Sequence, residues 1–280
     1  MSLSSSRRPV ILWYRQDLRV ADHPALTAAV ESGAPVLPLF VLDDATPGGW
    51  RPGGASRWWL AGSLAALDGE LRARGSRLIL RRGRAADALG ALVAETGAGG
   101  MVFTRRYEPA HAAEERALAE AWDGRGLACR RFGGGLLFEP EAVRTKAGDP
   151  FRVFTPFYRA CLAAAAPRAP LAAPARIPAP VAWPDSERLE DWRLRPTAPD
   201  WAQGLRARWR PGGAGAKARL EAFLDERLAG YAHDRDRPDR DGTSSLSAHL
   251  HFGEISPRQL WHGVRHLADA GRGADGDGEA

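Results

Sequence analysis

Short apolar runs alternate with helical patterns over the first 132 residues of this 280-residue chain, and this alternation restricts the fold more than any other feature. The five apolar runs lie at 10–14, 35–42, 78–80, 101–103 and 127–132. Most of them are apolar on successive residues, as are strands that are buried on both faces of a parallel sheet. The helical patterns between them lie at 24–31, 56–74, 84–96 and 110–122. This order predicts an α/β domain built on a doubly wound parallel sheet.

The segment after the first strand contains charged residues where a doubly wound sheet usually binds its ligand. Arg15, Asp17 and Arg19 follow the strand, and Asp22 is predicted to cap the next helix. No G-x-G-x-x-G follows the first strand, and G-x-x-x-x-G-K-[ST] does not occur in the sequence, which argues against the usual dinucleotide and P-loop sites. From these residues alone we interpret 15–19 as a surface turn braced by its own salt bridges.

The overall composition excludes several classes of protein. Apolar residues make up 44% and charged residues 26% of the chain, which is typical of a globular protein. No run of about 18 apolar residues occurs, so no membrane span is predicted. The polar start at 1–8 lacks a hydrophobic signal core, and the predicted compartment is the cytoplasm. Cys129 and Cys161 are too few for a disulfide framework.

Arginine dominates the basic side chains. Lys146 and Lys217 are the only lysines among 39 basic residues, and the formal net charge is +5. Arginine binds phosphate bidentately and lysine does not, so the excess is one sign of a nucleic-acid partner. A GC-rich genome produces the same excess, and a charge of +5 is spread thinly over 280 residues. Composition alone therefore leaves the partner open.

A proline-rich segment separates the alternating half from a helical one. Gly133–Gly135 end the alternation, and 166–199 contains eight prolines, which exclude a single helix or a central strand. Trp183, Trp192 and Trp201 predict that this extended connection packs along a surface, with a disordered linker as the alternative.

Two helical patterns lie in the last quarter of the chain. One covers 214–230, and the other opens with Ser256-Pro257-Arg258-Gln259, which combines an N-cap, a proline at the first helical position and a capping-box glutamine. The second helix is expected to end near residue 270, with Gly271 past its end. His262 and His266 have the i, i+4 spacing of zinc ligands, but no third ligand follows, so no metal site is predicted.

The stretch between these helices has the most specific chemistry. Asp241-Gly242 is typical of a turn, and four hydroxyl side chains follow at the start of the next predicted helix: Thr243, Ser244, Ser245 and Ser247. Unpaired N–H groups and hydroxyls at a helix N-terminus favour phosphate binding, with ordinary helix capping as the alternative. Tyr231 and the arginines at 235, 237 and 240 make the phosphate interpretation more specific.

Three segments, in this order, resemble the DNA photolyase and cryptochrome family. Residues 12–19 (LWYRQDLR), with Asp22 and 24–26 (PAL), are similar to its opening strand and turn. Residues 148–157 (GDPFRVFTPF) resemble its interdomain segment, and 231–256 resembles its flavin phosphate-binding stretch. The likeness covers essentially the whole chain and is greatest to the N-terminal portion of bacterial cyclobutane-pyrimidine-dimer photolyases.

The resemblance implies a fold, an activity and a partner. It implies a Rossmann-like α/β antenna domain at 1–132, an interdomain connector at 133–211, and the first part of an all-helical FAD-binding domain at 212–280. The implied enzyme is a deoxyribodipyrimidine photo-lyase, a carbon–carbon lyase, in which light-excited reduced FAD gives an electron to a pyrimidine dimer flipped out of the duplex. UV-damaged DNA is the implied partner, and we expect a monomer.

The resemblance also implies binding residues. Carried over by position, the residues that would contact FAD are Tyr231, Thr243, Ser244, Ser245, Leu246 and Ser247. Arg235 would lie near the DNA backbone, and 15–19 would be structural or border the antenna pocket. No catalytic residue is implied in this portion. Folate-binding members have an Asn-Glu pair where this chain has Ala110-His111, so the second chromophore, methenyltetrahydrofolate or a deazaflavin, stays open.

The family's later helices supply the isoalloxazine contacts, the lesion pocket and a tryptophan electron-transfer chain, whereas 271–280 is a tail of glycine, alanine and acids. We therefore expect this chain to be the N-terminal portion of a photolyase and to bind FAD weakly by itself. Repair activity would belong to the full-length protein. Two alternatives stay open: a cryptochrome-type blue-light photoreceptor, and a truncated non-enzymatic nucleotide-binding or interaction protein.

Overall fold

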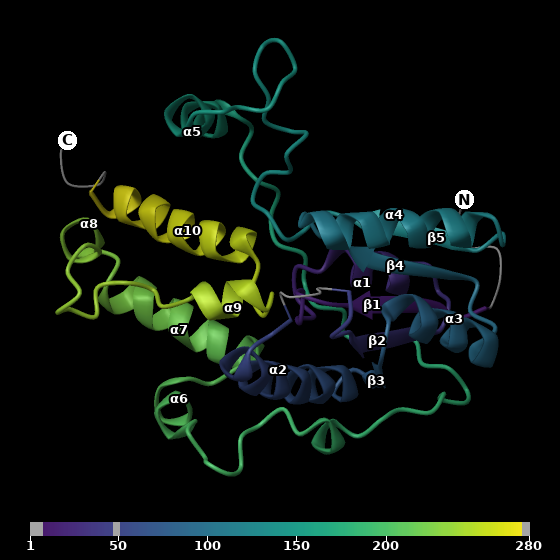
Figure 1. The fold of residues 1–280 in the computed structure, drawn as a ribbon. Helices are drawn as coiled ribbons and strands as arrows, with labels where there is room; N and C mark the ends of the chain where they lie inside the picture. Colours follow the sequence, from purple (N-terminus) through teal and green to yellow (C-terminus); the bar gives the residue numbers. More distant parts are fainter. Residues whose placement is uncertain (1–7, 47–50, 276–280) are drawn as a thin grey trace.

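A parallel β-sheet lies at the centre of the N-terminal half of the molecule (Figure 1). The computed structural model describes residues 8–46 and 51–275. Within them the strands are β1 (Val10–Tyr14), β2 (Val36–Leu42), β3 (Ile79–Arg82), β4 (Gly100–Thr104) and β5 (Ala128–Phe132). They pair in the order β3-β2-β1-β4-β5, and every pairing is parallel. The predicted doubly wound α/β fold is confirmed, and the strand order reverses between β1 and β4.

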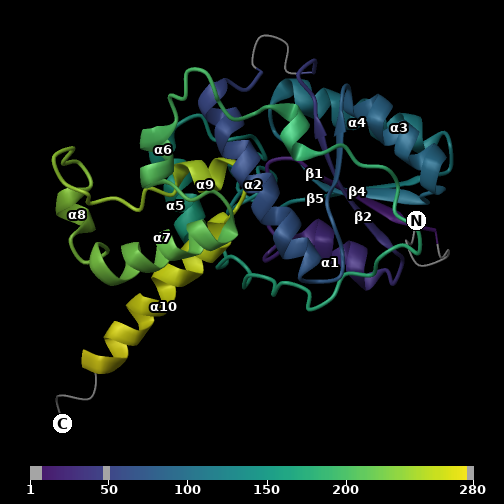
Figure 2. The ribbon, with the colours of Figure 1, turned by 90° about the horizontal axis from the view of Figure 1, so that it is seen from below.

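Helices cover both faces of this sheet (Figure 2). On one face are α1 (Pro24–Glu31) and α2 (Gly54–Arg72), and on the other are α3 (Ala85–Thr96) and α4 (Pro109–Asp123). Successive side chains of a strand point to opposite faces. In β1, Leu12 therefore packs in the cluster with α1 and α2, whereas Ile11 packs with α3 and α4. All residues of β1, β2 and β4 are buried, which explains their continuous apolar runs.

Asp22 does not cap α1, contrary to our expectation. The N-cap is His23, whose Nδ1 accepts a hydrogen bond from the N–H of Leu26 at 3.0 Å. Asp22 has a left-handed backbone with φ 46°, and its side chain is buried. It accepts hydrogen bonds from Ser256 Oγ (2.5 Å) and Arg168 Nη1 (2.8 Å), so it joins α1 to segments far along the chain.

The connector packs against the α/β unit over much of its length. The N–H of Ile177 donates to the carbonyl of Arg74, and the N–H of Glu187 donates to the carbonyl of Leu80, both at 2.9 Å. Trp192 closes the short 3-10 helix η3 (Leu189–Trp192), and its side chain is buried in the α1 and α2 core. The prediction of a packed connection is thus confirmed for this stretch.

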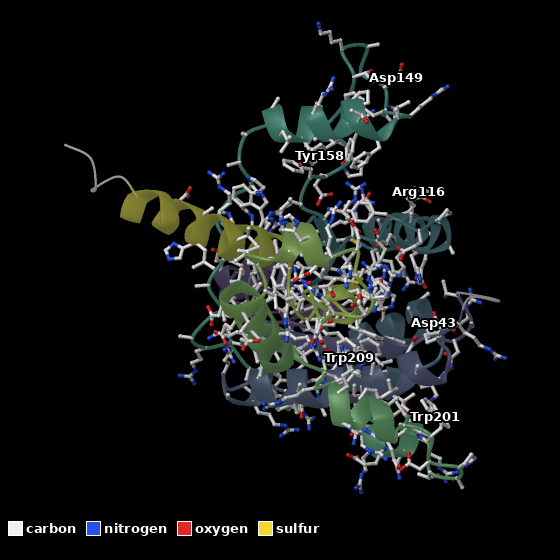
Figure 3. All side chains as sticks on the ribbon, turned by 90° about the vertical axis from the view of Figure 1, so that its left-hand side faces the viewer. Asp43, Arg116, Asp149, Tyr158, Trp201 and Trp209 are labelled. Carbon is white, nitrogen blue, oxygen red and sulfur yellow. The ribbon has the colours of Figure 1, made fainter. Side chains whose placement is uncertain are left out.

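Two other parts of the connector are exposed. Helix α5 (Phe154–Ala163) projects away from the remaining helices (Figures 1 and 3). Phe154 and Leu162 on this helix are more than half exposed. Trp201, which precedes α6 (Gln203–Arg208), has an exposed fraction of 47%. One edge of its ring nevertheless lies close to the backbone of Gly54, at the start of α2.

The C-terminal part is helical, as predicted. It comprises α7 (Gly213–Glu226), α8 (Tyr231–Asp234), α9 (Ser247–His251) and α10 (Pro257–Asp275). The capping box of α10 is confirmed: Ser256 Oγ accepts from the N–H of Gln259 at 3.1 Å, and Gln259 Oε1 accepts from the N–H of Ser256 at 2.9 Å. The expected end near residue 270 is wrong, because α10 continues through Gly271. A glycine inside a helix costs about 1 kcal/mol relative to alanine and does not by itself end the helix.

Some expectations fall at the boundaries of the described structure. Residues 276–280 of the predicted tail and 1–7 of the polar start lie outside the described residues. β5 ends at Phe132 and α7 begins at Gly213, next to the boundaries drawn at 132 and 211. The division into three units stays a prediction.

The turn between α9 and α10 lies directly against the loop after β1. Gly253 has φ +68°, and a Cβ built there would lie 2.1 Å from the carbonyl oxygen of Gln16. The carbonyl of Phe252 accepts from the N–H of Leu18 at 3.1 Å, and that of Gly253 accepts from Arg19 Nη1 at 3.0 Å. The helical part is therefore joined to the α/β part through backbone contact.

Replacing Gly253 by alanine is expected to destabilise the protein strongly. The added Cβ meets backbone atoms and also disfavours the left-handed conformation, so we expect a loss of roughly 3 kcal/mol or more in the free energy of unfolding. The matched control is Gly75→Ala, since Gly75 has φ +79° and a Cβ added there would meet nothing within 4 Å. Urea unfolding measures both variants, and equal losses would contradict the close approach at Gly253.

Replacing Asp22 by asparagine is expected to change how stability depends on pH. Burial raises the pKa of Asp22, but hydrogen bonds from Ser256, the N–H of Leu171 and Arg168 outweigh it and hold this pKa below its usual value. The resulting stability is fully present above the unfolded pKa of about 3.9 and is lost as pH falls through the lower folded pKa.

Asp22→Asn should therefore cost about 1–3 kcal/mol at pH 7, and the difference from the wild type should shrink below about pH 4. Urea unfolding at a series of pH values measures it. Asp225→Asn, at an exposed position of α7, serves as the control. A constant difference between Asp22→Asn and wild type down to acid pH would refute the assigned role.

Candidate functional site

A pocket of about 240 Å³ opens beside the carboxyl ends of β1 and β4, at the reversal of strand order. One wall comes from the loops after these strands, and another from α9 and the turn that follows it. The connector contributes residues 134–136. The lining combines charged with apolar side chains, among them Asp17, Arg19, Arg105, Arg106, Glu108, His251, Leu250 and Ile255. The pocket therefore lies between the α/β part and the helical part.

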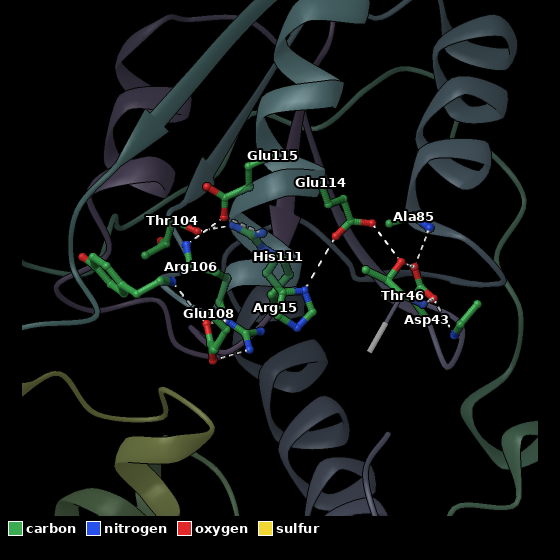
Figure 4. A network of polar contacts seen from close by, with 12 residues as sticks. Arg15, Asp43, Thr46, Ala85, Thr104, Arg106, Glu108, His111, Glu114 and Glu115 are labelled. Carbon is green, nitrogen blue, oxygen red and sulfur yellow. Dashed lines mark hydrogen bonds and ion pairs between the residues drawn. The ribbon is translucent and has the colours of Figure 1, made fainter. Parts of the chain in front are cut away.

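Arg15 occupies the end of the sheet between β1 and β4 (Figure 4). Its Nη1 lies 2.8 Å from Glu115 Oε1, and its Nη2 donates to the carbonyl of Thr104. The guanidinium lies 4.3 Å from the ring centroid of Trp13 and 4.9 Å from that of Phe103. Burial lowers the pKa of Arg15, and Glu115 opposes this shift. The protein's own arginine thus covers the strand ends where a doubly wound sheet usually binds a ligand.

The interpretation of 15–19 as a surface turn braced by its own salt bridges is wrong. Asp17 and Arg19 are buried. Asp17 Oδ2 lies 2.9 Å from His23 Nε2. Burial raises the pKa of Asp17, but His23 and the N–H of Arg15 reverse the shift and hold it well below its usual range. Arg19 donates to the carbonyl oxygens of Asp22, Gly134 and Gly253. The turn is structural, and three of its residues also border the pocket.

A second polar cluster lies after β2 (Figure 4). The Thr46 hydroxyl donates to Asp43 at 2.6 Å and lies 3.1 Å from Glu114 Oε1. Asp43 also accepts from the N–H of Ala85 at 3.0 Å. His111 Nδ1 lies 3.7 Å from Glu114. His111 therefore belongs to this cluster and not to the pocket lining.

The predicted FAD-contacting residues of 243–247 form one continuous segment, a loop that ends in the first residue of α9. Thr243 and Ser247 are exposed, Ser244 and Ser245 are half-buried, and Leu246 is buried against Ile255 and Leu220. Only Ser247 belongs to the helix, and Leu246 is its N-cap. The hydroxyls are thus not capping groups: no side-chain hydrogen bond caps α9. Ordinary capping, the alternative interpretation, does not explain them.

This loop has unpaired hydrogen-bond donors. Within the described part of the chain, the hydroxyls of residues 243–247 make no hydrogen bond, and their backbone N–H groups donate to no backbone carbonyl. Ser245 has a left-handed backbone with φ 50°, an uncommon conformation that concentrates at functional sites. Helix α9 has five residues, so its dipole adds little. The free N–H and hydroxyl groups are what fit an anionic diphosphate here.

Tyr231 and Arg235 lie at the two ends of α8, which contacts the turn before this loop. A Cβ on Gly242 would lie 2.5 Å from Cβ of Asp234, which places α8 directly beside the turn that leads into the loop. Tyr231 is partly exposed, and its ring packs edge-on against Phe223 with centroids 5.6 Å apart. Arg235 extends from the end of α8 with a 55% exposed side chain, 3.4 Å from Asp236. The structure therefore places α8 beside Gly242, the residue that precedes Thr243, and buries Leu246 in the apolar cluster with Leu220 and Ile255.

The charges of the arginine-rich stretch pair with one another at the surface. Arg237 contacts Asp239 and Arg240 contacts Asp234, each at 2.8 Å. Such exposed pairs contribute little to stability and exchange partners readily. The stretch therefore presents guanidinium groups that an incoming phosphate can engage.

Sequence reasoning missed the buried carboxylate of Glu254. Its Oε1 accepts from Trp59 Nε1 (3.1 Å), Ser63 Oγ (2.6 Å) and the N–H of Gly212 (2.6 Å). Its Oε2 lies 2.5 Å from His249 Nδ1, and both side chains are fully buried. A single acid within an otherwise apolar Phe-Gly-Glu-Ile run was the available signal for a buried, fully paired charge.

Metals and thiols add no further site. Among the described residues, no group of three His, Cys, Asp or Glu is arranged to hold a metal ion. His262 Nε2 instead lies 3.0 Å from the carbonyl oxygen of Arg168. Cys129 is half-buried in β5, and burial raises the pKa of its thiol to about 11, so it stays protonated at neutral pH. In the part of the chain that the structure describes, no helix has the length and apolar character needed to cross a membrane.

Known proteins share both the sequence and the fold of this chain. A model of the DNA photolyase family matches residues 10–179. The deoxyribodipyrimidine photo-lyase of Agrobacterium fabrum is 45% identical over 268 residues, which cover 96% of this chain and 55% of that protein. Cryptochrome-1 of Arabidopsis thaliana is 38% identical over 261 residues, which cover 91% of this chain and 37% of that protein.

The crystal structure of a bacterial class III photolyase from Agrobacterium tumefaciens superposes with a TM-score of 0.89 at 45% identity. The match covers 96% of this chain and 56% of that one. The chain thus spans about half the length of the photolyases it matches. Because the family model covers more than half of the chain, and sequence and fold agree, this chain belongs to the DNA photolyase family.

Proposed function

We propose that this chain provides the α/β unit and the diphosphate-binding loop of a deoxyribodipyrimidine photo-lyase that repairs DNA with light. The substrate is a cyclobutane pyrimidine dimer in UV-damaged DNA. The observation that supports this most is the segment 243–247, whose hydroxyl and N–H donors have no partner among the described residues and which follows the exposed arginines of 235–240 in the chain. A cofactor diphosphate and a DNA backbone both require such donors.

FAD is the proposed cofactor, and the loop fits its diphosphate. The hydroxyls of Thr243, Ser244 and Ser247 would donate to phosphate oxygens together with the neighbouring backbone N–H groups. Leu246 holds the loop in place, because its side chain is buried in the apolar cluster with residues of α7 and α10. Tyr231, on α8, would border the same site. When bound, reduced FAD supplies the light-excited electron that splits the dimer.

Arg235 is proposed to contact the DNA backbone. Its guanidinium is exposed, and Asp236 is its partner at 3.4 Å. Exchanging that exposed carboxylate for a DNA phosphate costs little. Release of counterions from DNA then favours the complex.

The pocket between the α/β part and α9 is proposed to hold the second chromophore. Its volume of about 240 Å³ is below the roughly 300–1,000 Å³ of pockets that enclose a drug-sized ligand, so it suits one ring system. Methenyltetrahydrofolate and a deazaflavin both have such a ring system. The charged rim of Arg105, Arg106 and Glu108 would bind polar substituents at the pocket mouth.

We also propose that the protein is a monomer and that it lies in the cytoplasm. Cys129 and Cys161 are both free, which suits a reducing compartment. A second candidate function is that of a cryptochrome-type blue-light photoreceptor, which the likeness to a plant cryptochrome favours. The two functions differ in whether dimers are repaired.

Removing the loop hydroxyls is expected to weaken binding of FAD. The variant is Thr243→Ala/Ser244→Ala/Ser247→Ala, which keeps Ser245 because of its left-handed backbone. Loss of three donors to a charged diphosphate should raise the Kd at least about tenfold. The measurement is titration of the purified chain with FAD, up to millimolar concentrations, followed by flavin fluorescence.

Two ligand controls make this test specific for the diphosphate. ADP binding should weaken in parallel with FAD binding, whereas any binding of riboflavin should not change. The unfolding midpoint should stay within experimental error, because these hydroxyls make no hydrogen bond within the described structure. Equal FAD affinity of variant and wild type, or no FAD binding by either, would count against the proposed site.

Light-dependent repair by the complete gene product tests the activity itself. We expect dimers in an oligonucleotide to disappear under blue light, and Arg235→Ala to raise the KM for damaged DNA about three- to tenfold without changing the flavin spectrum. Arg72→Ala, an exposed arginine on α2 paired with Asp68, is the matched control. A light-responsive flavoprotein that leaves the dimers intact would favour the cryptochrome function instead.

A further inference from the structure

Glu254 connects segments that are far apart in the sequence. Three hydrogen bonds reach one oxygen of its carboxylate, two of them from α2 and one from the N-cap of α7. The other oxygen contacts His249 on α9. A buried carboxylate is tolerated only when its hydrogen-bonding capacity is satisfied, so each donor is fixed in place by the charge that it neutralises.

Aromatic packing surrounds this carboxylate and joins the same helices. The ring of Trp59 on α2 stacks on Phe252 at 6.1 Å between centroids, and it meets the edge of the His249 ring at 5.0 Å. Trp209, which precedes α7 and is labelled in Figure 3, is partly buried, and its ring centroid lies 5.4 Å from that of Trp59. The N-terminus of α7 is equally close to α2, since a Cβ on Gly212 would lie 2.4 Å from Ala66 Cβ.

Helix α9 depends on these contacts for its position. A helix of five residues is far too short to be stable by itself in water. No side-chain hydrogen bond caps it. His249 is its one buried residue, and this residue contacts both Glu254 and Trp59. The loop at 243–247 leads directly into α9, so whatever holds α9 also holds the loop.

We propose that Glu254, through His249 on one side and Ser63 and Trp59 on the other, is the positioning residue that fixes the diphosphate-binding loop relative to the α/β unit. The affinity for the cofactor should then depend on residues of α2, although α2 is a helix of the α/β unit. The inference rests on the proposed function for the identity of the ligand. Its structural content, that α2 holds α9 through Glu254, is independent of that ligand.

Ser63→Ala is the most informative variant. It removes one hydrogen-bond donor to Glu254 from α2 and does not alter the sequence of Glu254, α9 or the loop. We expect the amides of Leu250, Phe252 and Glu254, which donate to carbonyls within or next to α9, to exchange about five- to tenfold faster. The Kd for FAD and for ADP should rise by a similar factor. The amides of β1 should exchange as in the wild type.

Ser76→Ala is the matched control: Ser76 is also a buried serine of the α/β unit, and its hydroxyl has no partner among the described residues. Glu254→Gln adds a rescue test, because an amide oxygen still accepts the three hydrogen bonds to Oε1. Glu254→Gln should therefore bind FAD and ADP more tightly than Glu254→Ala does.

Unchanged α9 exchange in Ser63→Ala, or an equal increase in Ser76→Ala, would overturn the inference. Faster exchange without weaker FAD and ADP binding would also overturn it, because the loop would then not follow α9. A wild-type chain that binds neither FAD nor ADP refutes the proposed function, and the exchange measurement then decides by itself whether Glu254 holds α9.

Discussion

The contact between the turn at 252–256 and the loop after β1 is the interaction on which the rest of the structure depends. Gly253 allows the two backbones to approach within van der Waals distance. Next to it, Arg19 and Glu254 are buried charges, and each has partners in the opposite part of the chain: Gly253 for Arg19, and Trp59 and Ser63 for Glu254. An unpaired charge at such a position would cost several kcal/mol, so each part supplies the groups that the other requires.

This junction also determines where ligands can bind. The pocket lies between the same two segments, because the loop after β1 lines one side and α9 the other. Arg15 closes the alternative position at the strand ends by its contacts with Glu115, Trp13 and Phe103. The pocket therefore lies at the boundary with the helical part and not directly over the strand ends that Arg15 covers. A ligand there would contact both parts at once.

The sequence predicts those features that depend on neighbouring residues. The strands and helices of the first 132 residues follow from hydrophobic periodicity, and the capping box of α10 follows from Ser256 and Gln259, three residues apart. Features that depend on distant partners were not predictable. Asp22 resembled a helix cap, but its partner Ser256 is 234 residues away. Residues 15–19 resembled a surface turn because the sequence shows only the neighbouring charges as possible partners. The carbonyl oxygens of Gly134 and Gly253, which accept from Arg19, are far along the chain.

The proposed binding loop differs from this junction in how its polar groups are satisfied. At Glu254, four donors converge on one carboxylate, whereas the described donors of 243–247 have no hydrogen-bond partner within the described structure. A loop that used its own donors could not offer them to a phosphate, and a loop without a rigid support would lose affinity through the entropy of ordering. The two requirements are met by neighbouring segments of one short stretch: 247–256 supplies the support, and 243–247 supplies the free donors. The affinity for a diphosphate should therefore depend as much on buried residues of α2 as on the hydroxyls that touch it.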